Sequence, residues 1–543
     1  ADVTAVQLDD PEPVSLRAAL QTDTMAEWLT ATRSELSAHR KNGTWTVISA
    51  LPPGRSAIPS RFVFKIKHGP AGEILKYKCR LVAKGFRQRP FLDYNATYAP
   101  TLRTSTFRML CALACQHSLL FHTLDVSTAF LVPPLREELY LRLPEQDLVN
   151  QHLPDYHSAS LVRLNKTLYG LVQSPREFYL HLSKVLGTMD LKQSSQDPCL
   201  WLCVRKGQLI CAIAFYVDDI CVVCVEEEIQ AFKSALQRNF QMTGGDEISW
   251  FLGVRVRRDV AAGTFALDQS AAILRLLAQY SMADCAPVST PMDARLIIDT
   301  SPLEQEERTF MLGKPYRALV GSLLYLLFTR PDITFSVNQL TRHLDNPRRS
   351  HWTAALRLLK YLRGTATLTL HYQRQEESSF SLVGYSDSDW GGCVTTRKST
   401  TGYAFLLCGA AISWKTKLQP SVALSTCEAE LMALSEAGRE AIWLRCMSDE
   451  LAQRFASDPV PINEDNQAAR LLVQDRRFSE RTKHVALRHF FVREEVGNGT
   501  IIVPYCPTHL MIADILTKAL QRVIFERLRS MLGLREPPSE HRS

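Results

Sequence analysis

The sequence predicts an α+β protein of several domains, one of which contains an antiparallel sheet. Three observations favour this class. The chain has 543 residues, too many for a single hydrophobic core and typical of two to four domains. An apolar run at 209–225 has the β-branched and aromatic content of two short strands joined by a turn. Beyond Phe380 a second pattern begins, with a strand, a hairpin, a helix, a strand and a helix.

The composition is that of an ordinary globular protein, with 46% hydrophobic and 22% charged residues. The net charge of +7 is informative only where the cations cluster. The 14 cysteines form no evenly spaced framework, and we see no secretory leader before them, which favours a reducing compartment. Cys221 and Cys224 lie three apart in a predicted strand and point to opposite faces, so they do not predict a zinc site.

The first cluster of cations follows a leader, residues 1–40, in which we expect a helix from Met25 to His39. Residues 61–89 contain nine Lys or Arg against one acid, Glu73. Apolar and cationic residues alternate on both sides of a predicted turn at 68–72, which indicates a hairpin. One face of this hairpin would carry cations suited to a phosphate backbone or a triphosphate. These cations are Lys65, Lys67, Lys76, Lys78 and Arg80.

Two adjacent carboxylates, Asp218 and Asp219, lie in the middle of the apolar run at 209–225. A membrane span is rejected, because each Asp at a helix centre would cost roughly 2.5–3.5 kcal/mol. Buried charge is costly unless it is paired or bound to a metal. A hairpin with paired carboxylates at its tip is therefore a place to hold a divalent cation through oxygen ligands.

The segment Phe215-Tyr216-Val217-Asp218-Asp219 resembles the Tyr-x-Asp-Asp box of reverse transcriptases. From about Trp45 to about Gly533 the chain is similar to the polymerase and RNase H portion of copia-type (Pseudoviridae) LTR retrotransposon polyproteins. The resemblance implies a right-hand polymerase with fingers, palm and thumb, a linking region and an α/β RNase H-like domain. The implied divisions are a leader (1–40), fingers and palm (41–255), thumb and connection (256–375), an RNase H domain (376–520) and a C-terminal tail (521–543).

The resemblance also assigns a polymerase site. Asp125, at the end of Thr123-Leu124-Asp125, supplies a third carboxylate. Asp125 and Asp218 would bridge two Mg²⁺ ions, with Mn²⁺ as the alternative, and Asp219 would support them. Phe130 would stack beneath the nucleotide sugar and exclude a 2′-hydroxyl. The family usually continues Leu-Asn-Gly after this position, whereas residues 131–134 here are Leu-Val-Pro-Pro, which alters the turn without removing a ligand.

Contacts with nucleotide and nucleic acid are implied in the same way. The fingers segment 78–86, the template-contact segment 168–176 and the primer-grip hairpin at 251–254 carry them. The predicted nucleotide-binding residues are Lys78, Arg80, Phe130 and Tyr169, and the sequence does not decide which of Lys78 and Arg80 touches the triphosphate. The predicted nucleic-acid-binding residues are Lys65, Lys67, Gly170, Gln173, Phe251, Leu252, Gly253, Arg481 and Lys483.

A second set of acids follows residue 380. Asp387 and Asp389 lie two apart on one strand face, so spacing does not separate them, and family position selects Asp387. Ser425 and Glu428 form a capping box, which leaves Glu430 without a structural role. The set that the resemblance implies as catalytic acids and as ligands of two further divalent cations is Asp387, Glu430, Asp465 and, on a closing helix, Asp514.

The resemblance implies an RNA-directed and DNA-directed DNA polymerase that copies retrotransposon RNA into cDNA and degrades the RNA of the hybrid. The implied partners are an RNA template, a DNA primer, an RNA/DNA hybrid and dNTPs, with integrase, capsid and a homodimer as further candidates and no membrane. The implied location is cytoplasmic, within virus-like particles, or nuclear with the cDNA complex. Two alternatives stay open. An RNA-directed RNA polymerase is disfavoured by Phe130 and the second acid set, and a binding protein with inactive sites is disfavoured by the seven intact carboxylates.

Overall fold

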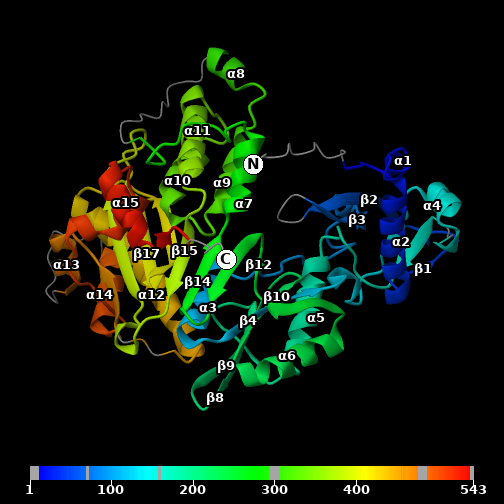
Figure 1. Ribbon diagram of the computed structural model, residues 1–543, viewed down its shortest axis with the longest axis horizontal. Coiled ribbons are helices and arrows are strands. Elements are labelled where there is room, and N and C mark those ends of the chain that lie inside the picture. Colours follow the sequence, from blue (N-terminus) through cyan, green and yellow to red (C-terminus); the bar gives the residue numbers. More distant parts are fainter. Residues whose placement is uncertain are drawn as a thin grey trace, which may run out of the picture.

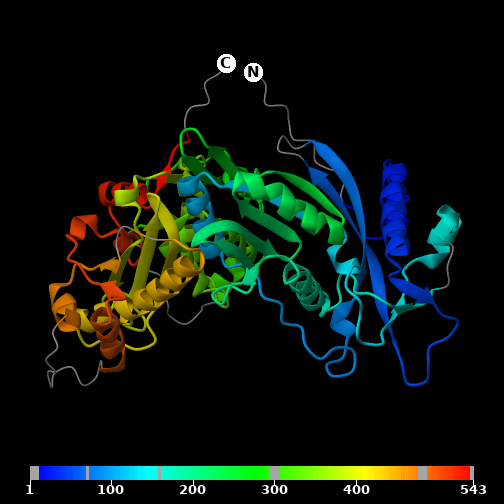
Figure 2. The same ribbon diagram turned by 90° about the horizontal axis from the view of Figure 1, so that it is seen from below.

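The computed structural model describes residues 12–68, 73–156, 160–293, 305–453, 455, 458–474 and 486–537. In these residues the strands form four sheets, and the predicted α+β class agrees with this arrangement. The first and fourth sheets lie at opposite ends of the molecule, with the second between them (Figures 1 and 2). In the described part of the chain, no helix combines the length and the apolar character needed to cross a bilayer.

The first sheet contains the predicted cationic hairpin. Its alternation is as expected, since Phe62 and Phe64 are buried while Lys65 lies opposite Lys78 on the other face. Trp28 of helix α2 packs edge-on against Phe64 and so covers the apolar face. The strand order is β1 (Trp45–Val47), β6 (Leu161–Leu164), β5 (Tyr140–Arg142), β2 (Ala57–His68) and β3 (Ile74–Ala83), and the helices are α1 (Leu16–Ala19), α2 (Met25–Asn42) and α4 (Gln146–His152).

The second sheet is antiparallel throughout and contains the hairpin predicted at 209–225. Its order is β11 (Met242–Glu247), β4 (Leu120–Val126), β10 (Asp219–Cys224), β9 (Gln208–Tyr216), β8 (Leu200–Arg205) and β7 (Lys192–Gln193). The helices here are α3 (Thr104–His117), α5 (Ser174–Leu186) and α6 (Glu226–Asn239). Helix α6 buries Ile229, Phe232 and Leu236, and α3 is buried along most of its length.

The third sheet joins segments that are far apart in the chain. Its order is β12 (Trp250–Phe251), β13 (Val254–Asp259), β14 (Thr264–Asp268), β15 (Thr369–Gln373) and β21 (Leu534–Arg535). The helices near it in sequence are α7 (Ser270–Gln279), α8 (Gln305–Met311), α9 (Tyr316–Leu326), α10 (Thr334–Thr341), α11 (Arg349–Gly364) and α15 (Arg522–Met531). The segment predicted as a tail therefore includes a helix and a strand, and Phe525 of α15 packs edge-on against the buried Tyr361.

The fourth sheet combines an antiparallel meander with two parallel strands. Its order is β18 (Ala410–Leu418), β17 (Thr400–Leu407), β16 (Val383–Asp389), β19 (Val460–Asn463) and β20 (Ile501–Ile502). Strands β18, β17 and β16 are antiparallel, whereas β19 pairs in parallel with both β16 and β20. The helices are α12 (Thr426–Glu450), α13 (Gln467–Gln474) and α14 (Ala486–Gly497). Asp514 was predicted on a closing helix. It lies instead on a buried 3₁₀ segment, Ile512–Leu516, packed against β16 and β17.

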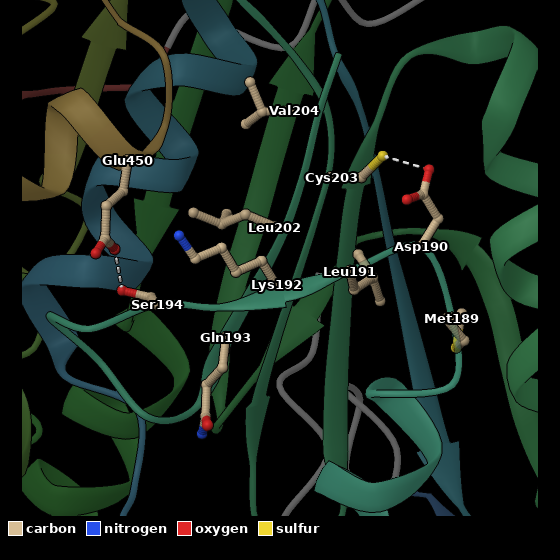
Figure 3. A pocket seen from close by; sticks show the side chains of 10 residues that line it. All are labelled: Met189, Asp190, Leu191, Lys192, Gln193, Ser194, Leu202, Cys203, Val204 and Glu450. Carbon is tan, nitrogen blue, oxygen red and sulfur yellow. Dashed lines mark hydrogen bonds between the residues drawn. The ribbon is translucent and has the colours of Figure 1, made fainter.

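Helices α3 and α12 connect the second sheet to the fourth. Arg108 of α3 is only 4% exposed, and its Nε donates to the carbonyl of Ile412 at 2.7 Å. The guanidinium also lies over the Trp414 ring, 3.8 Å from its centroid. Glu450 of α12 also accepts a hydrogen bond from the Ser194 hydroxyl, in the loop after β7 (Figure 3). These contacts fix the second sheet against the fourth.

Candidate active sites

The first carboxylate cluster lies where β4 and β10 are paired. Asp125 and Asp219 are direct partners across these two strands. The amide of Val126 donates to the carbonyl of Asp218 at 3.2 Å, which holds the hairpin tip against β4. The turn requires a left-handed φ of 58° at Val217, a strained value for a β-branched residue. The structure thus brings Asp125, Asp218 and Asp219 together, and the departure at 131–134 does not disturb this pairing.

The carboxylates of this cluster repel one another. Burial, followed by repulsion from Asp218 and Asp125, raises the pKa of Asp219 to about 6. Burial also raises the pKa of Asp218. A divalent cation would relieve both effects, and carboxylate oxygens are the ligands that Mg²⁺ prefers. The donor set therefore fits the cation that the sequence implied.

The cationic face of the β2–β3 hairpin approaches this cluster. The pKa of Lys78 is lowered by burial and by the neighbouring Arg80 and Lys67, and Asp125 opposes that shift. Arg80 lies over the ring of Tyr169 at 4.3 Å, and Tyr169 meets Phe130 edge-on at 5.0 Å. Lys78 and Arg80 both remain candidates for a triphosphate. Lys65 and Lys67 share this face, and Lys65 pairs with Glu12.

Two predicted nucleic-acid contacts are corrected by burial. Gln173 is fully buried, where its Nε2 donates to the carbonyl of Asp93 at 3.0 Å and its Oε1 accepts from Gln88. Phe251 is 3% exposed and stacks on Phe107 at 4.6 Å. Both side chains are packed in the protein interior and do not face a bound nucleic acid from these positions.

The other predicted contacts stay predictions. At Gly170, φ is 88° and an added Cβ would lie 2.2 Å from the Ala83 carbonyl oxygen. The glycine therefore allows the backbone at residue 170 to pack closely against the end of β3. Leu252 and Gly253 form the turn between β12 and β13, and Gly253 is exposed. Arg481 and Lys483 lie outside the described residues.

The second carboxylate cluster gathers acids from a strand, a helix and a strand end. Ligand oxygens of Asp387, Glu430 and Asp465 all lie within 4.8 Å of one another. Asp387 and Glu430 are 3% and 6% exposed, so the cluster is buried apart from Asp465. The Glu428 amide donates to Ser425 Oγ at 3.1 Å, as the capping box predicts. Glu428 is therefore committed to the helix start, whereas Glu430 projects into the cluster.

Asp514 joins this cluster through a lysine that the sequence analysis missed. Lys518 Nζ lies 2.7 Å from Asp514 and 3.7 Å from Asp387. Burial and Asp387 raise the pKa of Asp514 to about 7, although Lys518 opposes the shift. The signal that could have identified Lys518 is its position four residues after Asp514.

Glu464 is a further acid that sequence reasoning passed over in favour of its neighbour Asp465. Glu464 is fully buried, and burial, followed by nearby carboxylates, raises its pKa. Burial and the adjacent Glu464 likewise raise the pKa of Glu430. In the described part of the chain, Oε2 of Glu464 has no hydrogen-bond partner. So many buried carboxylates with one lysine between them favour a site that accepts cations.

In EDTA we expect the thermal stability of the protein to fall as the pH rises. A carboxyl with a raised pKa in the folded state stabilises the fold below its unfolded pKa and loses that contribution as the pH rises through its folded pKa. For Asp219 and Asp514 these folded values are about 6 and about 7, against 3.8 for the unfolded groups. The melting temperature should therefore drop between about pH 4 and about pH 8 in EDTA, and drop less with Mg²⁺. A profile that is flat in EDTA would contradict these electrostatics.

A cavity of about 420 Å³ lies apart from both clusters. It is lined by residues of the β7–β8 region and by Glu450 at the end of α12 (Figure 3). Its polar groups include Asp190, which accepts a weak hydrogen bond from the Cys203 thiol. No predicted site residue lines it, so the two carboxylate clusters remain the candidate sites.

Comparisons with known proteins match both halves of the chain. Residues 42–294 match the family described as reverse transcriptase (RNA-dependent DNA polymerase). The chain is 34% identical over 532 residues to the Retrovirus-related Pol polyprotein from transposon TNT 1-94 of Nicotiana tabacum, covering 97% of this chain and 39% of that protein. The corresponding protein from transposon RE2 of Arabidopsis thaliana is 35% identical over 527 residues, covering 96% of this chain and 35% of that protein.

Residues 42–294 belong to the reverse transcriptase family, and nearly the whole chain is similar to copia-type LTR retrotransposon polyproteins. The chain spans 39% and 35% of the length of those two polyproteins. The foamy viral protease-reverse transcriptase dRH, solved in complex with ds DNA, is 12% identical with a TM-score of 0.48, covering 88% of this chain and 69% of that chain.

Proposed function

We propose that this chain is an RNA-directed and DNA-directed DNA polymerase with an RNase H activity. It copies retrotransposon RNA into cDNA and degrades the RNA strand of the resulting hybrid. The observation that carries the proposal is the presence of two separate carboxylate clusters, each beside a different sheet. The first is Asp125, Asp218 and Asp219, and the second is Asp387, Glu430, Asp465 and Asp514.

The first cluster would serve nucleotide addition. Divalent cations held by Asp125 and Asp218 would activate the primer 3′-hydroxyl and neutralise the leaving pyrophosphate. Lys78 and Arg80 supply positive charge from the adjacent hairpin and suit the triphosphate. The exposed turn at Leu252 and Gly253 is available to the primer strand.

The second cluster would serve RNA hydrolysis. Asp387, Glu430 and Asp465 provide a set of oxygens close enough to share one cation. Lys518 holds Asp514 and balances part of the negative charge. With water as the nucleophile, the leaving group is the 3′-hydroxyl of the cut RNA. Strand β16, the end of β19, helix α12 and the 3₁₀ segment Ile512–Leu516 together hold the four acids beside the fourth sheet, which supports an RNase H-like domain.

The experiment is a two-product assay on one duplex. A 5′-labelled DNA primer is annealed to an RNA template that carries a second label, and wild-type protein is added with Mg²⁺ and dNTPs. We expect longer DNA and shorter RNA, and neither product in EDTA. If no primer is extended, the chain is a nucleic-acid-binding protein with inactive sites. If it extends with NTPs in preference to dNTPs, it is an RNA polymerase.

Phe130→Val is expected to relax the selection of deoxynucleotides. The ring of Phe130 is half-buried and held edge-on against Tyr169 and Phe178, which fixes a flat obstacle beside the proposed nucleotide position. Loss of such packing typically changes discrimination by on the order of 10- to 200-fold. The ratio of kcat/KM for dGTP to that for GTP should fall by about this factor, while Phe130→Tyr keeps it. An unchanged ratio for Phe130→Val would assign the gate to another residue.

The proposed partners follow from this function. They are an RNA template, a DNA primer, an RNA/DNA hybrid and dNTPs, together with integrase, capsid or a second copy of the chain. We place the activity in the cytoplasm within virus-like particles, with transfer of the cDNA complex to the nucleus. Co-purification of the activity with capsid from cells that express a complete element tests this location.

A further inference from the structure

The end of strand β19 carries one more acid than the four to which RNA hydrolysis is assigned. Glu464 directly precedes Asp465 and is fully buried. Its backbone is fixed by the segment after β20, because its amide donates to the Pro504 carbonyl at 3.1 Å and its carbonyl accepts from the Cys506 amide at 3.0 Å. The strand itself therefore holds this side chain in the interior.

A structural role accounts for only one of the two carboxylate oxygens of Glu464. Its Oε1 accepts from the Asn466 amide at 3.0 Å. Helix α13, which follows, is already capped, since Asn466 Oδ1 accepts from the Ala469 amide at 3.0 Å. In the described part of the chain, Oε2 of Glu464 has no hydrogen-bond partner. A buried carboxylate oxygen without a partner is costly, and it points to a group that binds there.

Glu430 of α12 shows the same feature. It is 6% exposed, and among the described residues its Oε2 also lacks a hydrogen-bond partner. After burial, Glu464 is the strongest cause of the raised pKa of Glu430, which places the two carboxylates close together. Burial and then Glu464 also raise the pKa of the Cys427 thiol in the first turn of α12. The two glutamates therefore lie together between the start of α12 and the fourth sheet.

The protein supplies little positive charge to this place. Burial raises the pKa of Glu464, and the two charged groups that add to the shift, Asp387 and Asp465, are both acids. Lys518 is bound elsewhere in the cluster, with its Nζ 2.7 Å from Asp514 and 3.7 Å from Asp387. Buried carboxylates are stable when they are paired or bind a metal. Glu464 thus adds negative charge at a position that its own chain does not neutralise.

With Glu464 included, the charge of the cluster matches that of two divalent cations. Five carboxylates at −1 and the one ammonium of Lys518 at +1 leave a net charge of −4. Without Glu464 the lysine would leave the other four acids with −3, one charge short of two divalent ions. The five acids are Asp387, Glu430, Glu464, Asp465 and Asp514.

We propose that Glu464 is a fifth acid of the second cluster, where its buried negative charge tightens the binding of divalent cations. The proposal deepens the proposed function and rests on it, because RNA hydrolysis is assigned to that cluster. Glu464 is a positioning residue and not a catalytic one. It is fully buried, so it acts on the cations through its charge and does not touch RNA.

The test measures cation binding in the absence of nucleic acid. Asp218→Asn combined with Asp219→Asn serves as the background, so that the second cluster is the site that remains, and free Mn²⁺ is measured by electron paramagnetic resonance. Glu464→Gln keeps the volume and can still accept from the Asn466 amide, but it removes the charge. We expect its Kd for Mn²⁺ to rise roughly 10- to 100-fold. Glu464→Asp, which keeps the charge, should retain most of the affinity.

Glu440→Gln is the matched control. Glu440 is a half-buried acid on the same helix, about 15 Å along its axis from Glu430, and it accepts from Ser413 at 2.6 Å. Loss of its charge should leave the Mn²⁺ affinity unchanged. An unchanged affinity in Glu464→Gln would overturn the proposal. An equal loss in Glu440→Gln would also overturn it, because the effect would then be common to acids of this domain.

Melting temperatures separate a role in cation binding from a role in folding. In EDTA, Glu464→Gln should melt no lower than wild type, whereas it should gain less stability from Mn²⁺. A variant that melts lower in EDTA and gains as much from Mn²⁺ as wild type would make Glu464 a structural acid and overturn the proposal. If wild-type protein cleaved no RNA, the Mn²⁺ affinities would still be measurable, so this inference and the proposed function fail separately.

Discussion

Replacing Asp218 and Asp219 by Asn is expected to abolish primer extension and leave RNA cleavage intact. Asn keeps the volume of each side chain and the turn at Val217, but it removes two negative charges from the tip beside Asp125. The cations would then lose most of their ligands. A fall in kcat/KM for extension of roughly 10³-fold or more, about 4 kcal/mol in the barrier, is the expected size.

The control for this pair is Asp246→Asn. Asp246 is an exposed acid on β11, the neighbour of β4 on its other edge. This variant should extend primers at the wild-type rate, which shows that loss of a surface charge near the site is harmless. Parallel loss of RNA cleavage in the Asp218/Asp219 variant would mean that the protein had unfolded or that the clusters do not act separately.

Asp465→Asn is expected to give the reverse result, with RNA cleavage lost and primer extension retained. Asp465 is the least buried of the three acids that lie within 4.8 Å of one another. Its Oδ2 accepts from Thr508 at 2.8 Å, so the side chain is already oriented toward Asp387 and Glu430. Asn can still accept that hydrogen bond but cannot supply the charge. Cleavage of a labelled RNA/DNA hybrid should fall by on the order of 10³-fold.

The matched control for cleavage is Asp449→Asn, because Asp449 is exposed on α12. It should cleave as wild type does. Normal cleavage by Asp465→Asn would contradict the assignment of the second cluster as a catalytic site. Loss of extension in Asp465→Asn would likewise contradict two independent sites.

Local sequence was sufficient to predict structure where the apolar pattern or a capping motif was unambiguous. The run at 209–225 is apolar on both sides, so its carboxylates had to lie at a turn, and they do. The capping box at Ser425 assigned Glu428 to the helix start, and the family resemblance then selected Glu430. In both cases a structural role, or the lack of one, could be assigned from a few neighbouring residues.

Contacts between residues that are far apart in the chain could not be predicted from local sequence. Spacing does not indicate that β21 pairs with β15, so residues 521–543 were expected to be a tail. The burial of Gln173 and Phe251 depends on Asp93 and Phe107, which lie in other segments. Lys518 was missed because its role appears only when Asp387 and Asp514 are brought together. Such contacts are decided by the tertiary fold and not by local preference.

The most direct test of the central claim is to map cation positions on the chain itself. Fe²⁺ with ascorbate and peroxide generates hydroxyl radicals that cut the backbone beside each bound ion. We predict cuts near Asp125 and Asp218 and a separate set near Asp387, Glu430 and Asp465, both suppressed by excess Mg²⁺. The Asp218/Asp219 variant should lose only the first set. Cuts at one cluster alone, or at neither, would contradict a protein built around two divalent cation sites.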